Sequence, residues 1–180
     1  MKNNNKIDVF KYLLATAVFL ILLLADQISK YLIVSRLDEG QEINIISNVF
    51  VLKYIKNFGA AFGILQNKRL FFCILTFLFM VLVIRFFCII PSEKKYRPLR
   101  ITVILLSSGA VGNFIDRLFL VYVRDFLYFK LINFPIFNFA DIYVVVAAFL
   151  LMILVLFYYK DEDFYFIKEF FGKNRFTSKG

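Results

Sequence analysis

The sequence has 180 residues, of which 61% are hydrophobic and 19% aromatic, and its formal net charge is +9. A chain of this length suits one domain, and this composition lies far outside the range of soluble globular proteins, so it predicts a membrane protein. The sequence contains no histidine, which excludes histidine-based triads, HExxH zinc sites and imidazole proton shuttles.

Four apolar segments are long enough to cross a bilayer, since about 20 consecutive apolar residues span its hydrocarbon core. They cover residues 10–33, 70–90, 99–120 and 136–159. A cleavable signal peptide is the competing interpretation of the first segment, but the residues after Leu24 offer no small-residue cleavage site and three more apolar segments follow. We predict an all-α membrane protein with four transmembrane helices, forming a single integral membrane domain over residues 1–180.

The segment between the first two spans, residues 40–66, has a different pattern. β-Branched and polar residues alternate from Ile43 to Ile55, which favours strands, and they are too polar to lie in lipid as an unpaired sheet. We predict a small extracytoplasmic β-sheet at the membrane surface. It ends in a turn where Gly59 and Gly63 permit close approach of the backbone.

Two further segments lie outside the spans. Residues 121–134, which carry Asp125, are predicted to form a loop or surface segment. Residues 160–180 form a charged cytoplasmic tail whose aromatic side chains indicate a short helix on the membrane surface. Within the third span, the small residues from Ser107 to Gly112 predict close helix packing.

The charge distribution predicts the orientation. The N-terminus, the connector after the second span and the C-terminal tail hold 13 Lys and Arg against 6 acids, whereas the other two loops and the adjoining span ends hold 9 against 7. The positive-inside rule then places both termini in the cytoplasm. The polar residues without an obvious solubilising role all fall at the outer ends of the spans: Asp26, Lys30, Asn57, Asn113, Asp116, Arg117, Asp125, Asn138 and Asp141.

Four of these outer residues are aspartates, and paired carboxylates suggest a chemistry. Two carboxylates held close together cannot both ionise cheaply, so one keeps a proton while the pair activates a water that attacks a carbonyl group. This is the logic of an aspartic peptidase, and it needs neither metal nor cofactor. Asp141 has no basic neighbour within a helical turn, which favours it as one member of the pair.

The residues alone leave the second member open. Asp26 has Lys30 at i+4 on the same helix face, and Asp116 is followed by Arg117. A neighbouring cation favours an ionised, structural carboxylate. Asp125 is therefore preferred over Asp116, because a loop can approach the end of the fourth span.

Three other functions are alternatives. A serine-lysine hydrolase is disfavoured because Ser29 and Lys30 are adjacent on a helix and point apart, while Ser107 and Ser108 have no lysine nearby in the sequence. A transporter or proton channel predicts acids spread through the membrane depth, but the midsections of the spans are nearly free of them. A membrane scaffold would not require so many converging amides and acids.

The order and spacing of five motifs resemble those of the lipoprotein signal peptidase family, also called signal peptidase II, from the first span to the fourth. The motifs are D-Q-I-S-K at residues 26–30, N-F-G-A-A-F-G at 57–63, G-N-F-I-D-R at 112–117, V-R-D-F at 123–126 and F-N-F-A-D at 137–141.

The resemblance implies that Asp125 and Asp141 form a catalytic dyad. Asp116 is implied to be structural, paired with Arg117 or with a neighbouring polar group. The residues implied to position the substrate or brace the dyad are Asp26, Lys30, Asn57, Gly59, Asn113, Arg117 and Asn138.

The resemblance also implies the substrate and the location. The family removes the signal peptide of a prolipoprotein by cleaving before a cysteine that bears a diacylglyceryl group, and cyclic peptides of the globomycin type inhibit it. We expect a multi-pass protein of the bacterial cytoplasmic (inner) membrane, with its site at the outer face and no metal or cofactor. The positive charge suits anionic membrane lipids, nucleic acid is not an expected partner because the basic residues border the spans, and we expect a monomer.

Overall fold

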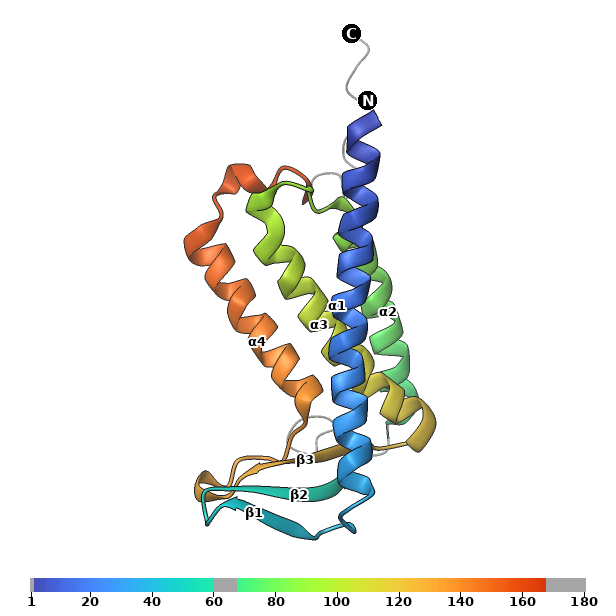
Figure 1. Ribbon diagram of the computed structural model, residues 1–180, viewed down its shortest axis with the longest axis vertical. Helices are drawn as coiled ribbons and strands as arrows, with labels where there is room; N and C mark the ends of the chain where they lie inside the picture. The colour runs from blue at the N-terminus through green and yellow to red at the C-terminus, as the bar shows by residue number, and fades with distance from the viewer. Residues whose placement is uncertain (1, 60–67, 168–180) are drawn as a thin grey trace.

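The computed structural model describes residues 2–59 and 68–167, and the described residues contain four long helices and one small sheet (Figure 1). The helices are α1 (Lys2–Val34), α2 (Arg69–Ile89), α3 (Arg97–Leu120) and α4 (Phe139–Ile153), and α4 continues as a π-helical turn at Leu154–Tyr158. Each contains a stretch long and apolar enough to cross a membrane. The predicted fold class, a four-span membrane protein with a small sheet, is confirmed.

Helix α3 lies at the centre of the bundle, where it packs against α1, α2 and α4. Two glycines make this packing close. A Cβ atom added to Gly112 would lie 2.6 Å from the Asp26 Oδ2 atom of α1, and one added to Gly109 would lie 2.7 Å from the Val144 Cγ2 atom of α4. The prediction that the small residues of the third span permit close helix packing is confirmed. The other three helices expose apolar side chains outward, as expected of surfaces in contact with lipid tails.

The sheet lies across one end of the bundle (Figure 1). Its three antiparallel strands, in the spatial order β1-β2-β3, are β1 (Glu42–Ile46), β2 (Phe50–Asn57) and β3 (Val123–Phe129). We call this the sheet end, and the other the opposite end.

Strand β3 corrects the prediction of a loop or surface segment over residues 121–134. Its side chains do not alternate between buried and exposed, because Asp125, Phe126 and Leu127 are all buried. The strand pairs with β2 while the helix ends also cover it, so the period-2 pattern of a half-exposed strand is lost.

The opposite end of the bundle is closed by an aromatic cluster that includes the start of the C-terminal tail. The Tyr96 and Tyr159 rings stack with centroids 5.6 Å apart, and Phe166 meets the Tyr96 ring edge-on and is only 1% exposed. Lys95 also binds Asp163 at 2.5 Å. Up to Ile167 the tail therefore packs on the end of the bundle through Phe166 and contains a short 3₁₀ helix at Asp161–Phe164. Residues 168–180 lie outside the described residues, so the surface helix of the tail stays a prediction.

Candidate active site

The N-terminus of α4 organises the polar residues at the sheet end. Asn138 is the N-cap of this helix: its side-chain oxygen accepts a hydrogen bond from the Asp141 N–H group at 3.1 Å, and the Asp141 carboxylate accepts one from the Asn138 N–H group at 3.0 Å. This reciprocal capping box satisfies amide groups that an α-helix leaves unpaired at its start. It also fixes the Asp141 carboxylate at the positive end of the helix dipole.

The same asparagine holds Asp125. The side-chain amide of Asn138 donates to the Asp125 Oδ1 atom at 2.6 Å, and the amide of Asn57 donates to the Oδ2 atom at 2.8 Å. Asp125 is 2% exposed. Burial and the nearby charge of Asp141 raise the pKa of Asp125 to about 7, while the two amide hydrogen bonds oppose that rise.

Asn113 links Asp141 to the other helices. Its side-chain amide donates to the Asp141 Oδ1 atom at 2.8 Å, while its oxygen accepts from Asn138 at 3.1 Å and from the Lys30 ammonium group at 3.0 Å. The three asparagines therefore form a network through which both aspartates are held. The buried donors and acceptors of this network are satisfied, as a stable polar core requires.

Lys30 and Asp26 form a buried ion pair beneath this network. Both are 0% exposed, and the Lys30 Nζ atom lies 2.9 Å from Asp26 and 3.5 Å from Asp116. The other oxygen of Asp26 accepts a hydrogen bond from the Ala140 N–H group at 3.0 Å. Asp26 thus attaches α1 to the first turn of α4, and removing it would take one of two carboxylate partners from a buried cation and leave the Ala140 N–H group without its acceptor.

Asp116 pairs with Arg124 and Lys30, not with Arg117. Its carboxylate accepts from the Arg124 backbone N–H group at 2.9 Å and from the guanidinium group at 2.6 Å. This corrects the suggested pairing with Arg117 and supports the alternative, a neighbouring polar group. The reason is geometric: β3 runs alongside the end of α3, which brings Arg124 to the helix face that carries Asp116. The bonds fix the strand one residue before Asp125.

Two members of the site were not singled out from the sequence. Arg124 is one, and Gln27 is the other: Gln27 donates to Asp26 at 2.9 Å and to the Gly112 carbonyl at 3.1 Å, and its oxygen accepts from Arg124 at 2.9 Å. Both residues lie inside motifs that were identified in the sequence, and this was the one feature by which the sequence could have indicated a role for them. Apart from Asp26, their partners lie on other elements, which spacing alone does not reveal.

Arg117 instead fixes the turn after β2. Its guanidinium group donates to the Gly59 carbonyl at 2.9 Å and lies 4.8 Å from the centre of the Phe72 ring. The Gly59 N–H group in turn donates to the Asn57 side-chain oxygen at 2.9 Å, which orients the amide that reaches Asp125. Gly63 of the same turn lies outside the described residues.

The described cluster therefore contains more acids than bases. Its four carboxylates are Asp26, Asp116, Asp125 and Asp141, and its three cations are Lys30, Arg117 and Arg124. An unbalanced buried charge is expensive, so the fourth carboxylate is best accommodated by retaining a proton. Asn57, Asn113 and Asp141 are partly exposed, which gives water and a substrate access to the asparagines and aspartates of the cluster.

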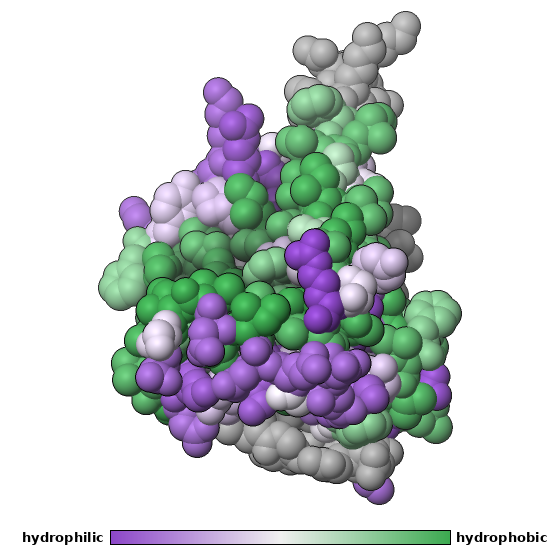
Figure 2. Space-filling view, turned by 60° about the horizontal axis from the view of Figure 1, so that its bottom comes forward, coloured by the Kyte–Doolittle hydropathy of each residue, from purple (hydrophilic) through white to green (hydrophobic). Residues whose placement is uncertain are grey.

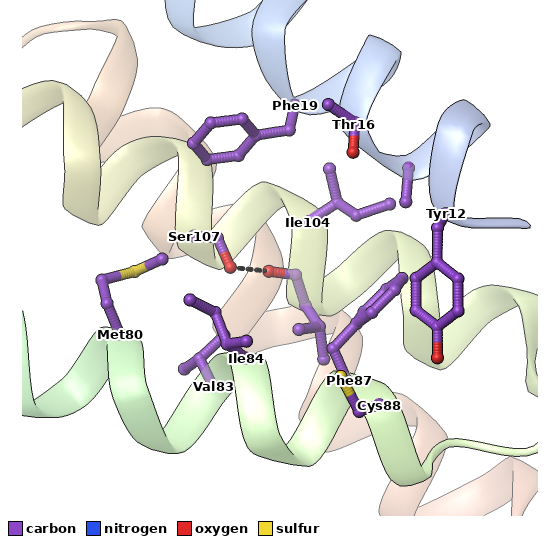
Figure 3. A pocket seen from close by; sticks show the side chains of 12 residues that line it. Tyr12, Thr16, Phe19, Met80, Val83, Ile84, Phe87, Cys88, Ile104 and Ser107 are labelled. Carbon is purple, nitrogen blue, oxygen red and sulfur yellow. Dashed lines mark hydrogen bonds between the residues drawn. The ribbon is translucent and has the colours of Figure 1, made fainter. Parts of the chain in front are cut away.

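An apolar cavity of about 370 Å³ lies elsewhere, among α1, α2 and α3 (Figure 3). Tyr12, which lines it, precedes Asp26 by 14 residues on the same helix, a separation of about 21 Å at 1.5 Å per residue. The lining side chains include no carboxylate, and Ser107 donates its hydroxyl to the Val103 carbonyl of its own helix. The cavity therefore lacks the polar groups that the sheet end supplies. In the part of the chain that the structure describes, no group of three Cys, Asp or Glu residues could hold a metal ion.

The fold and the site define a class: a multi-pass membrane protein with a site of carboxylates and amides at one end of its helices. A model of the family described as signal peptidase (SPase) II matches residues 18–157. The chain belongs to this signal peptidase II family and is a protease. The family membership predicted from the motifs is therefore confirmed.

Two relatives of this chain are named lipoprotein signal peptidase, and a solved structure has a similar fold. The lipoprotein signal peptidase of Brevibacillus brevis is 42% identical over 137 residues, covering 76% of this chain and 89% of the relative. That of Clostridium novyi is 42% identical over 133 residues, covering 70% and 86%. A solved structure described as a bacterial membrane enzyme superimposes with a TM-score of 0.71 at 30% identity, covering 79% of this chain and 87% of the other.

Proposed function

We propose that this protein removes the signal peptide from prolipoproteins by hydrolysing the peptide bond before an S-diacylglyceryl-cysteine, with Asp125 and Asp141 as an aspartic dyad. The family and the names of the relatives support the reaction class and the substrate. The observation that carries the dyad is the double role of Asn138, whose side chain binds Asp125 and closes the capping box with Asp141.

The dyad needs a single shared proton. Asp125 is the group best suited to keep it, because burial and the charge of Asp141 raise its pKa to about 7. The excess of carboxylates over cations in the cluster also favours a state in which one carboxylate is protonated. One carboxylate takes a proton from the attacking water, while the protonated member gives its proton to the carbonyl oxygen. Collapse of the tetrahedral intermediate breaks the C–N bond, and a carboxyl proton passes to the leaving amine.

The surrounding residues position the substrate. The guanidinium group of Arg117 and the amides of Asn57 and Asn113 are partly exposed beside the dyad and can bind the peptide backbone, with Gly59 permitting close approach. Lys30 and Asp26 are 0% exposed, so they act by bracing Asn113 and the start of α4. Asp116 holds Arg124 and so sets the position of Asp125.

The location of the site suits a lipid-modified substrate. All of these residues lie at the sheet end. We propose that this end is at the outer face of a bacterial cytoplasmic membrane, with both termini inside, because the positive-inside rule favours that orientation. A diacylglyceryl group is anchored in the same leaflet, so the modified cysteine reaches this depth without leaving the membrane. We further propose that globomycin-type cyclic peptides inhibit the protein by occupying this site, and that it acts as a monomer among membrane lipids.

The decisive experiment is mass spectrometry of a diacylglyceryl-modified precursor incubated with the purified protein in detergent. We expect cleavage directly before the modified cysteine, and none by the Asp125→Asn or Asp141→Asn variant. An unmodified precursor is the substrate control. Full turnover by either variant would show that its aspartate is not part of the dyad, and equal cleavage of the unmodified precursor would contradict the proposed substrate.

A further inference from the structure

One face of the sheet carries a row of apolar side chains that runs across all three strands. Asp125 on β3 binds Asn138 at the start of α4, so the Asp125 side of the strand faces the helices. Side chains alternate along a strand, which puts Leu127 and Phe129 on the same side. Phe137 forms an antiparallel bridge with Leu127, and its ring stacks on Phe129 on this same face, with centroids 5.8 Å apart.

The apolar face continues across the other two strands. Leu127 is opposite Leu52, which is opposite Ile43, and Phe129 is opposite Phe50, which is opposite Ile46. Residues directly opposite each other in a sheet project from the same face. The row from β3 to β1 is therefore apolar throughout.

At its β1 edge the other face of the sheet is ionic, whereas Val51 and Phe126, farther in on that face, are buried. Glu42 is opposite Lys53, and its carboxylate lies 3.7 Å from the Lys53 ammonium group and 2.5 Å from that of Lys130. Figure 2 shows hydrophilic residues gathered in a band across the sheet end of the molecule, bordered by hydrophobic ones. The sheet is thus amphipathic, with opposite faces suited to opposite solvents.

The outer part of the apolar face is not covered by the helices. Figure 1 shows the tip of the sheet, where β1 meets β2 and β3 ends, extending sideways beyond the lower end of α4. Apolar side chains there are exposed: Ile43 44%, Ile46 55%, Phe129 42%, Leu131 69%, Ile132 69% and Phe134 45%. A contiguous exposed apolar patch on a folded protein marks a binding surface.

We propose that this apolar tip, formed by Ile43, Ile46, Phe129, Leu131, Ile132 and Phe134, inserts into the lipid leaflet next to the active site. The tip stands where the span of α4 ends, and α4 exposes its own apolar side chains, such as Val145 (53%) and Phe149 (58%), to the lipid of that leaflet. The ionic face stays in water, as in an amphipathic element lying in a membrane interface.

Insertion of the tip would bring lipid of this leaflet close to the proposed dyad. Leu127 lies between Phe129 and Asp125 on one face of one strand, so lipid at the tip lies along the surface that leads to the site. This consequence rests on the proposed function, whereas the insertion itself does not.

The absence of tryptophan from the sequence makes a direct test available, because one introduced tryptophan is a unique fluorophore. The Ile132→Trp variant is reconstituted into phosphatidylcholine vesicles with and without acyl-chain-brominated lipid, a contact quencher. We expect blue-shifted emission and loss of more than half of its intensity. Leu131→Trp is a second reporter at the tip, should Ile132→Trp not fold.

Two controls complete the test. Asn44→Trp on β1 puts the fluorophore on the ionic face, since Asn44 alternates with Ile43, and it should emit as in water and escape quenching. Phe149→Trp on α4 should be quenched as the positive control. Unquenched, water-like emission at both tip positions, equal quenching at Asn44, or blue-shifted emission that brominated lipid leaves unchanged would each overturn the proposal; the last would indicate a protein contact.

A paired activity measurement separates this proposal from the proposed function. The Ile132→Lys variant should cleave a lipidated precursor at the wild-type rate in detergent but several-fold more slowly in vesicles. Failure of the wild-type protein to cleave at all would remove the proposed function and leave the fluorescence result standing.

Discussion

Replacing Asp125 with asparagine should abolish catalysis and still make the protein more stable above neutral pH. Burial and the charge of Asp141 raise the pKa of Asp125 from 3.8 to about 7. A shift of that size corresponds to about 4 kcal/mol at 1.36 kcal/mol per unit. This is the free energy that the folded protein loses by keeping the carboxylate ionised, and an uncharged amide does not lose it.

The direction in which the free energy of unfolding changes with pH follows from proton binding. Between about pH 4 and about pH 7 the folded state holds the Asp125 proton more tightly than the unfolded chain, so the free energy of unfolding falls as the pH rises through that range. Asp125→Asn lacks this decline. Part of the gain is lost because Asn57 and Asn138 both donate to Asp125, and one of them then faces the new NH₂ group, which costs about 1–3 kcal/mol.

Asp116→Asn is the matched control, because it makes the same chemical change at another buried aspartate. Asp116 binds the Arg124 guanidinium group and lies near the Lys30 ammonium group. Removing one partner of a buried ion pair costs about 3–5 kcal/mol. This variant should therefore be less stable than the wild type, and it should yield less folded protein.

The assay is reversible denaturation in detergent followed by circular dichroism at pH 5 and at pH 8, with cleavage measured on the same samples. We expect Asp125→Asn to be inactive and at least as stable as the wild type at pH 8. An Asp125→Asn variant as unstable as Asp116→Asn, or a wild-type protein that is more stable at pH 8 than at pH 5, would refute the assignment of the raised pKa to Asp125.

Three more outcomes are expected. Initial cleavage rates should fall above about pH 7, where Asp125 loses its proton; a rate that stays flat to pH 9 would argue against a shared proton. Asn138→Ala should lower stability by about 1 kcal/mol through the lost helix cap and abolish cleavage, whereas Asn138→Ser should restore only the stability; recovery of both would limit Asn138 to capping. Gly112→Ala should destabilise the fold by about 1–3 kcal/mol through overpacking, since its Cβ would lie 2.6 Å from Asp26 Oδ2; unchanged unfolding would show that α1 and α3 can separate there.

The sequence by itself determined the membrane architecture and predicted most residues of the candidate site, but not Arg124 or Gln27. Runs of apolar residues long enough to cross a bilayer have few alternatives to helices, because lipid supplies no hydrogen-bond partners for the backbone. The alternation from Ile43 to Ile55 similarly predicted β1 and β2. The five motifs identified the family, and the structure brings the described members of those motifs to one end of the bundle.

The tertiary structure alone decided how those residues are paired. Strand β3 has no period-2 pattern, since it is covered on both sides, and it became recognisable only through its pairing with β2. That pairing brings Arg124 to Asp116 in place of the adjacent Arg117. It also brings Asp125 to Asn138, 13 residues away.

The physical reason is that spacing along a chain predicts contacts within one helix or strand, whereas ion pairs and shared amides between elements depend on how those elements pack. The i, i+4 pair of Asp26 and Lys30 was visible in the sequence. The use of one asparagine side chain to bind Asp125 and cap the helix that carries Asp141 was not, because it requires β3 and α4 to meet.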